Sequence, residues 1–191
     1  MQIRIFCLPI FTGMLFQFIA DYLKHRLTAK SRHGTHSPFV YKLVDEVIYD
    51  FSAKKVYEDI EKQRKKLLND DKVGLNPRLA QLIYRLAHNH PPQPADIIVA
   101  QEIESNHRLD FVFIESERTK EATLNYFHTC LPKVHEGTLL IFNDIYRNKG
   151  MKEAWEEIKA HSQVTVTIDL FWIGLVYFKK GQVKEHFKIK F

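Results

Sequence analysis

The stretch "ADIIVAQEIESNHRLDFVFIES", residues 95–116, decides how this chain folds. It holds two apolar runs, residues 95–103 and 109–116, and both have the Ile, Val and Phe content of β-strands. The second run is continuous enough to be buried on both faces, as in a parallel sheet covered by helices. Only a short polar linker separates the runs. We therefore expect an antiparallel hairpin, because a parallel crossover usually takes a dozen or more residues.

Downstream of this stretch, helix and strand patterns alternate. The periodicity predicts, in order, a helix over 120–134, a strand over 137–144, a helix over 150–161, an antiparallel pair of strands over 164–171 and 174–180, and a short strand or extended tail over 186–191. We expect the runs at 109–116 and 137–144 to be parallel neighbours. This succession is typical of the second half of a doubly wound α/β sheet.

Upstream of residue 91 the pattern is helical. Apolar positions predict helices over 16–26, from residue 38 onward, over 53–70 and over 77–90. Ser37 can cap the second helix, with Pro38 at its first position, where a missing N–H costs nothing. We therefore expect two regions. Residues 1–90 form a helical region that packs on the core, and residues 91–191 form the α/β core.

The apolar run at residues 3–20 leaves two interpretations open. It is short for a membrane span and is interrupted by Pro9 and Gly13. A signal peptide is one interpretation, although no small-residue cleavage site follows. The interpretation that we favour is a helix docked on the core.

The composition excludes several classes of protein. The chain has 191 residues, 45% of them hydrophobic, which supports a real core. The net charge of +5 comes from scattered clusters such as residues 61–66, so we do not expect nucleic acid as a partner, and the short, interrupted apolar run at residues 3–20 argues against a membrane. Two cysteines, Cys7 and Cys130, form neither a disulfide framework nor a zinc site, which favours a reducing, cytoplasmic location. Cys130 is expected to be a buried helix residue.

Residues 110–178, "DFVFIESERTKEATLNYFHTCLPKVHEGTLLIFNDIYRNKGMKEAWEEIKAHSQVTVTIDLFWIGLVYF", resemble the C-terminal half of class I S-adenosylmethionine-dependent methyltransferases. The similarity is to a bacterial branch akin to small O-methyltransferases, and "RHGTHSPFVYKLVDEVIYD", residues 32–50, resembles the N-terminal helices of that branch. The resemblance implies a reduced Rossmann-like sheet with the fourth to seventh strands retained. It also implies S-adenosylmethionine and a divalent metal as cofactors.

The cofactor turn of that family is missing from this chain. In the family, the first strand ends in an acidic, Gly-rich turn that lets backbone approach the cofactor. Here the run at 95–103 takes the place of that strand, but Glu104 and Ser105 follow it, and no glycine occurs between Gly74 and Gly137. The second and third strands of the family are absent as well. No cofactor-binding residue can therefore be assigned.

The loops after the two buried strands hold the candidate site residues. The family pattern Ile-Asp-Gly-x-His reads Ile-Glu-Ser-Glu-Arg at 114–118, and Phe-Asp-Asp-Ile reads Phe-Asn-Asp-Ile at 142–145. We expect Glu115 and Asp144 as catalytic residues, and Glu115, Asn143 and Asp144 as oxygen ligands for Mg²⁺ or Ca²⁺. The alternative is a solvated acidic rim in which Asp144 caps the next helix. Arg118 stands in place of the family's His and cannot act as a general base.

Three hypotheses on function follow from these patterns. The favoured one is a degenerate methyltransferase-like remnant or interaction module without S-adenosylmethionine-dependent activity, a truncated pseudoenzyme. The second is an active O-methyltransferase with a rebuilt cofactor site. The third is a subunit completed by a partner chain, or by a second copy in a homo-oligomer, because loss of two strands exposes a sheet edge.

Overall fold

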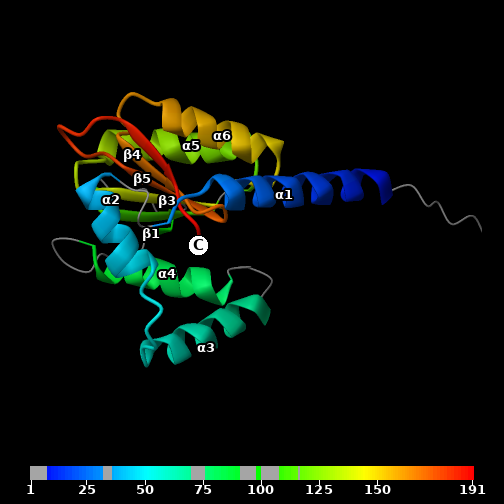
Figure 1. Ribbon diagram of the computed structural model, residues 1–191, viewed down its shortest axis with the longest axis horizontal. Helices are drawn as coiled ribbons and strands as arrows, with labels where there is room; N and C mark the ends of the chain where they lie inside the picture. Colours follow the sequence, from blue (N-terminus) through cyan, green and yellow to red (C-terminus); the bar gives the residue numbers. More distant parts are fainter. Residues whose placement is uncertain (1–7, 32–35, 70–75, 91–97, 100–107, 116) are drawn as a thin grey trace, which may run out of the picture. The chain divides into compact units, whose positions relative to one another are not determined.

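The computed structural model describes residues 8–31, 36–69, 76–90, 98–99, 108–115 and 117–191 (Figure 1). The elements, in chain order, are α1 (Leu8–Thr28), α2 (Pro38–Leu43) with its π-helical continuation Val44–Ile48, α3 (Val56–Asn69), α4 (Pro77–His88), β1 (Ile98–Val99), β2 (Phe111–Ile114), α5 (Lys120–Cys130) with a 3₁₀ turn Leu131–Lys133, β3 (Leu139–Asn143), α6 (Lys149–Ala160), β4 (Val166–Asp169), β5 (Ile173–Tyr177) and β6 (Glu185–Lys188).

The chain divides into two compact units. Met1–Ser31 and Ile97–Lys190 form the first, here called the sheet unit, and Arg32–Asp96 with Phe191 form the second, the helical unit. The predicted division placed residues 1–90 in one helical region. In the structure the described residues of the first segment, 8–31, group with the sheet instead.

The described sheet has six strands in the order β1-β2-β3-β5-β4-β6. β1, β2 and β3 are parallel to one another, and β5 runs antiparallel to both β3 and β4. β6 adds to β4 in parallel. The predicted parallel neighbours (β2 and β3) and the predicted antiparallel pair (β4 and β5) are thus confirmed. The architecture is a mixed α/β open sheet.

The predicted antiparallel hairpin around residues 95–116 is wrong. β1 pairs parallel to β2, with Ile98 opposite Val112 and Val99 opposite Phe113. The usual crossover length was the wrong guide, because β1 contributes only two residues to the pairing. The connection between two parallel strands must run back along the length of the first strand, and here that length is only two residues. The linker 100–110 can extend to about 36 Å at about 3.3 Å per residue, which is more than enough. The rest of the predicted strand 95–103 lies outside the described residues.

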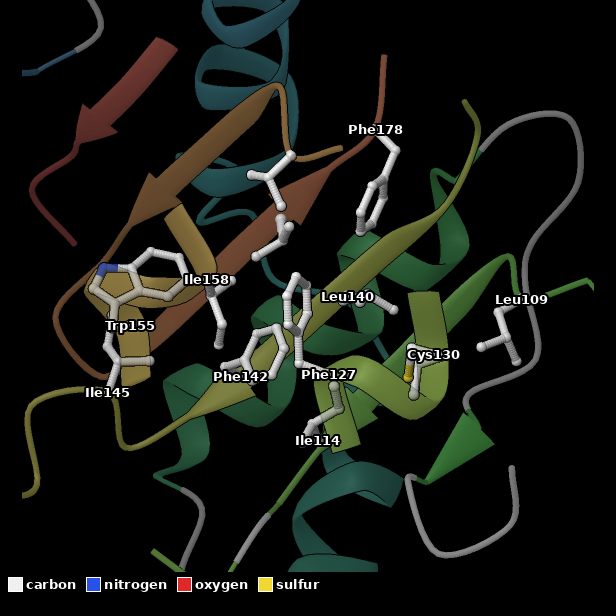
Figure 2. Close-up of a cluster of buried hydrophobic side chains, with 13 residues drawn as sticks. Leu109, Ile114, Phe127, Cys130, Leu140, Phe142, Ile145, Trp155, Ile158 and Phe178 are labelled. Atoms are coloured by element: carbon white, nitrogen blue, oxygen red, sulfur yellow. The ribbon is translucent and has the colours of Figure 1, made fainter. Parts of the chain in front are cut away.

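α5 and α6 pack on one face of the sheet and bury a cluster of apolar side chains (Figure 2). Phe127 of α5 and Ile158 of α6 point toward Phe142 of β3 in this view, and the Phe127 and Phe142 ring centroids lie 6.2 Å apart. Trp155 of α6 lies over β5 so closely that a Cβ at Gly174 would come within 2.6 Å of its ring. Every residue of β2, β4 and β5 is buried, as the continuous apolar runs predict.

α1 docks on the sheet unit through its C-terminal half. The rings of Phe18 and Tyr22 contact Phe171 at centroid distances of 5.2 and 5.0 Å. After the helix, Lys30 accepts a hydrogen bond from the N–H of Lys190 and donates one to the carbonyl of Lys188, at the end of β6. The docked-helix interpretation is confirmed for this half. Within the described residues, no helix combines the length and the apolarity needed to cross a bilayer.

The helical unit is tied together by a buried arginine. Arg85 of α4, only 2% exposed, donates from Nε to the carbonyl of Val47 at 2.8 Å and from Nη2 to that of Ile48 at 3.3 Å. These carbonyls end the π-helical turn and lack partners within it, so the guanidinium satisfies them. The predicted start of α4 is confirmed, because the Asn76 side chain accepts from the N–H of Arg78.

Candidate functional site

The candidate site lies at the carboxyl ends of β2 and β3, as predicted. These strands pair in parallel with Ile114 opposite Phe142, so Glu115, which follows β2, and Asn143, the last residue of β3, lie at the same level. Asp144 is next in the chain. The three predicted residues are thereby brought to one edge of the sheet, the edge where α/β proteins place ligands.

Arg118 occupies the space between the two carboxylates. Its Nε donates to Asp144 Oδ2 at 2.8 Å, and its Nη2 lies 3.9 Å from Glu115 Oε1. The Glu115 and Asp144 side chains are each 24% exposed, and the Arg118 side chain is 44% exposed. The guanidinium therefore neutralises the acidic pair and takes an oxygen that a metal ion would need.

Burial raises the pKa of the Glu115 carboxyl, Arg118 opposes this rise, and the negative charge of Asp144 adds to it. The net direction is upward. A carboxyl of this kind retains a proton more readily than a solvated one. It is a poorer ligand for a hard cation, which needs the ionised form.

The backbone of both loops is held in an uncommon conformation. Arg118 has φ +60° and Asp144 has φ +54°, in the left-handed region that favours glycine. Asn148 holds the loop of Arg118, because its Nδ2 donates to the carbonyl of Arg118 while its Oδ1 accepts from the N–H of Met151. Asn148, and not Asp144, is therefore the residue that caps α6, and the alternative capping role for Asp144 is wrong.

A metal site is weakly supported by these donors. Glu115 and Asp144 are the two carboxylates of the predicted trio, and Asn143 is half-buried at the end of β3. In the part of the chain that the structure describes, no three His, Cys, Asp or Glu side chains gather as they would around a metal ion. The trio brings three oxygen-bearing side chains to one edge of the sheet, but Arg118 balances the charge of its two carboxylates.

Sequence reasoning missed a second polar cluster, which is buried in the sheet unit. Asp169, at the end of β4, accepts from Tyr146 Oη at 2.8 Å and from the N–H of Phe171 at 2.9 Å. His25 Nε2 of α1 lies 3.0 Å from its Oδ1. His25 and Asp169 are both 2% exposed. The signal was present, because His25 follows Phe18 and Tyr22 on the docked face at helical spacing.

The hydrogen bonds decide the charge of Asp169. Burial alone would raise its pKa, but the bonds from His25, the N–H of Phe171 and Tyr146 outweigh that effect, and the net pKa lies below the ordinary value. Burial and the neighbouring Asp169 charge raise the pKa of Tyr146, so its hydroxyl stays a donor. The Asp169 carboxylate is therefore ionised and interacts with His25, Tyr146 and the N–H of Phe171. This arrangement indicates a structural role, in which the cluster holds α1 on the end of β4.

A cavity of about 400 Å³ lies beside this cluster, between α1 and the first turn of α6. Phe18, Asp21, Tyr146 and Lys152 are among the residues that line it. Lys152 Nζ and Asp21 Oδ2, 2.6 Å apart, form an ion pair at its wall. Glu115 and Asp144 do not line this cavity.

The cysteines and tryptophans have structural roles or lie outside the described residues. Cys130 is fully buried, and burial raises the pKa of its thiol to about 12, so it is a core residue as predicted. Trp155 packs in the core, and Trp172 lies 37% exposed against Phe18 and Phe171. Cys7 falls outside the described residues.

In comparisons with known proteins, no family model matches the sequence, and no curated protein matches it either. Function must therefore be inferred from the fold and from the geometry of the site.

Proposed function

We propose that this chain is a degenerate relative of the class I methyltransferases that no longer uses S-adenosylmethionine. The strand order supports the relationship. In that class an antiparallel strand lies between the fifth and sixth strands of the sheet, and β5 lies likewise between β3 and β4. By the resemblance, β2 to β5 then correspond to the fourth to seventh strands.

The main support for the proposed loss of cofactor binding is that no glycine occurs between Gly74 and Gly137. A Cβ on each residue of the turn keeps the backbone from the close approach that a nucleoside needs. Strand direction does not account for the loss, because β1 pairs in parallel with β2. The proposal depends instead on the missing glycines and on Arg118, which neutralises Glu115 and Asp144.

Titration calorimetry of the full chain with S-adenosylmethionine, with and without Mg²⁺, tests the proposal. We expect no saturable heat up to millimolar ligand, because the glycine-rich turn is missing from the sequence and Arg118 neutralises both carboxylates of the candidate site. The variant Glu115→Gln and its neighbour control Glu117→Gln, on an exposed side chain, should behave as the wild type does. Micromolar binding that Glu115→Gln weakens and Glu117→Gln leaves intact would restore the enzyme hypothesis.

A further inference from the structure

α1 carries a second apolar face, next to the one that docks on the sheet unit. Five large side chains of this outward face are between 48% and 85% exposed: Leu15, Phe16, Ile19, Leu23 and Leu27. At 3.6 residues per turn each step of four residues advances about 40°, so the four aliphatic residues span an arc of about 120° and Phe16 lies within it. The N-terminal turns of α1 also extend beyond the sheet (Figure 1).

The inward face of the helix is already occupied. Phe18 and Tyr22 contact Phe171, and His25 is buried against Asp169. A helix that is apolar on two sides exposes more hydrophobic surface than a water-facing helix normally does. A contiguous exposed face of this kind marks a place of contact with another surface.

The charges on α1 indicate the chemistry of that surface. By the same rotation the exposed Arg26 falls within the arc of the outward face and the exposed Lys24 lies beside it, and the exposed Lys30 follows the helix. The sole acidic residue in the sequence of α1 is Asp21, and its carboxylate is bound to Lys152 of α6 at 2.6 Å. A second copy of the helix would offer these cations no available acidic partner. Apolar side chains bordered by cations alone are typical of helices that lie on an anionic bilayer surface.

We propose that the outward face of α1 docks on an anionic phospholipid surface, with its apolar side chains in the headgroup region and Lys24 and Arg26 at the lipid phosphates. The helix lies along the surface, because its inward face remains on the sheet unit. The expectation against a membrane partner rested on the length of the apolar run, which bears on spanning a bilayer and not on lying against it. The proposal is independent of any methyltransferase ancestry.

Co-sedimentation of the full chain with vesicles tests it. Vesicles of equal parts phosphatidylglycerol and phosphatidylcholine should bind the protein, pure phosphatidylcholine should bind it less, and salt should weaken the binding. The double variant Phe16→Ser with Leu23→Ser should weaken binding more than about tenfold. It removes the favourable free energy of transferring two large apolar side chains from water into the headgroup region. Its control is Val183→Ser, which removes a side chain that is 79% exposed on the loop before β6.

Charge is tested separately by Lys24→Glu, which should weaken binding about tenfold, against Lys180→Glu, the same change at an exposed site away from α1. This pair decides the matter even if the double variant fails to fold, which circular dichroism would reveal. The proposal is overturned if the wild type does not bind anionic vesicles, or if the α1 variants bind as well as their controls. It is also overturned if light scattering without lipid shows a dimer that Phe16→Ser with Leu23→Ser dissociates, since the occupant would then be a second copy.

Discussion

At the scale of single residues, the buried carboxylate of Asp169 is the most consequential side chain in the sheet unit. It joins His25 of α1, Tyr146 and the backbone of Phe171. The substitution Asp169→Asn should lower the free energy of unfolding by about 3 kcal/mol, because a buried charged acceptor is lost to its donors. Urea denaturation at pH 7 measures the loss.

The exposed pair Asp110–His135 provides the matched control. Its atoms are 2.8 Å apart, but the Asp110 side chain is 59% exposed, so Asp110→Asn should cost less than about 1 kcal/mol. The pKa of Asp169 is depressed in the folded protein, so its contribution is complete above the ordinary value of 3.8 and is lost as the pH falls through the folded value. The gap between wild type and Asp169→Asn should therefore stay constant down to about pH 5 and shrink below pH 4. If Asp169→Asn and Asp110→Asn lowered the free energy of unfolding by the same amount, the buried position of Asp169 would not explain its contribution to stability.

At the scale of secondary-structure elements, the contact between α6 and β5 depends on a glycine. The ring of Trp155 lies where the Cβ of residue 174 would be, at 2.6 Å, and Gly174 pairs with Phe142 in the middle of the sheet. Gly174→Ala should destabilise the protein by about 2 kcal/mol, because neither the strand nor the buried indole can move without disturbing the core. Thermal unfolding followed by circular dichroism measures it. Gly13→Ala in α1, with no atom within 4 Å of the new Cβ, should instead stabilise the helix slightly. If Gly13→Ala also destabilised the protein, the effect of Gly174→Ala would be attributed to the loss of glycine's backbone freedom and not to the contact with Trp155.

Local patterns predicted the elements that depend on local chemistry. The continuous apolar runs gave β2 to β5, Asn76–Pro77 marked the start of α4, and the pairing of β4 with β5 followed from their short connection. The direction of β1 was missed because a two-residue strand needs no long crossover. The role of Arg118 was only half seen: its inability to act as a base was clear, but its bond to Asp144 required a structure.

At the scale of the whole molecule, contacts between distant segments decide the division into units. His25 and Asp169 are 144 residues apart along the chain, and Lys30 bonds the backbone beside β6. No periodicity within a window of a few turns can register such pairings, so the predicted boundary near residue 90 kept α1 with the helices that follow it. The apolar positions that predict the helix over 16–26 are Phe18, Ile19, Tyr22 and Leu23. In the structure Phe18 and Tyr22 dock on Phe171, and Ile19 and Leu23 are exposed.

Two truncations test whether α1 is an integral part of the sheet unit. A chain that begins at Met14 retains Phe18, Tyr22 and His25, so its urea midpoint should stay close to that of the full chain. A chain that begins at Ser31 loses these side chains and the bonds of Lys30 to β6, and it leaves Asp169 without its histidine. We expect the second truncation to cost more than about 3 kcal/mol, the scale of a broken buried pair together with lost apolar burial. Equal urea midpoints for the two truncated chains would mean that the stability of the sheet does not depend on α1. The shorter truncation keeps every residue of the outward face, and should therefore keep vesicle binding as well.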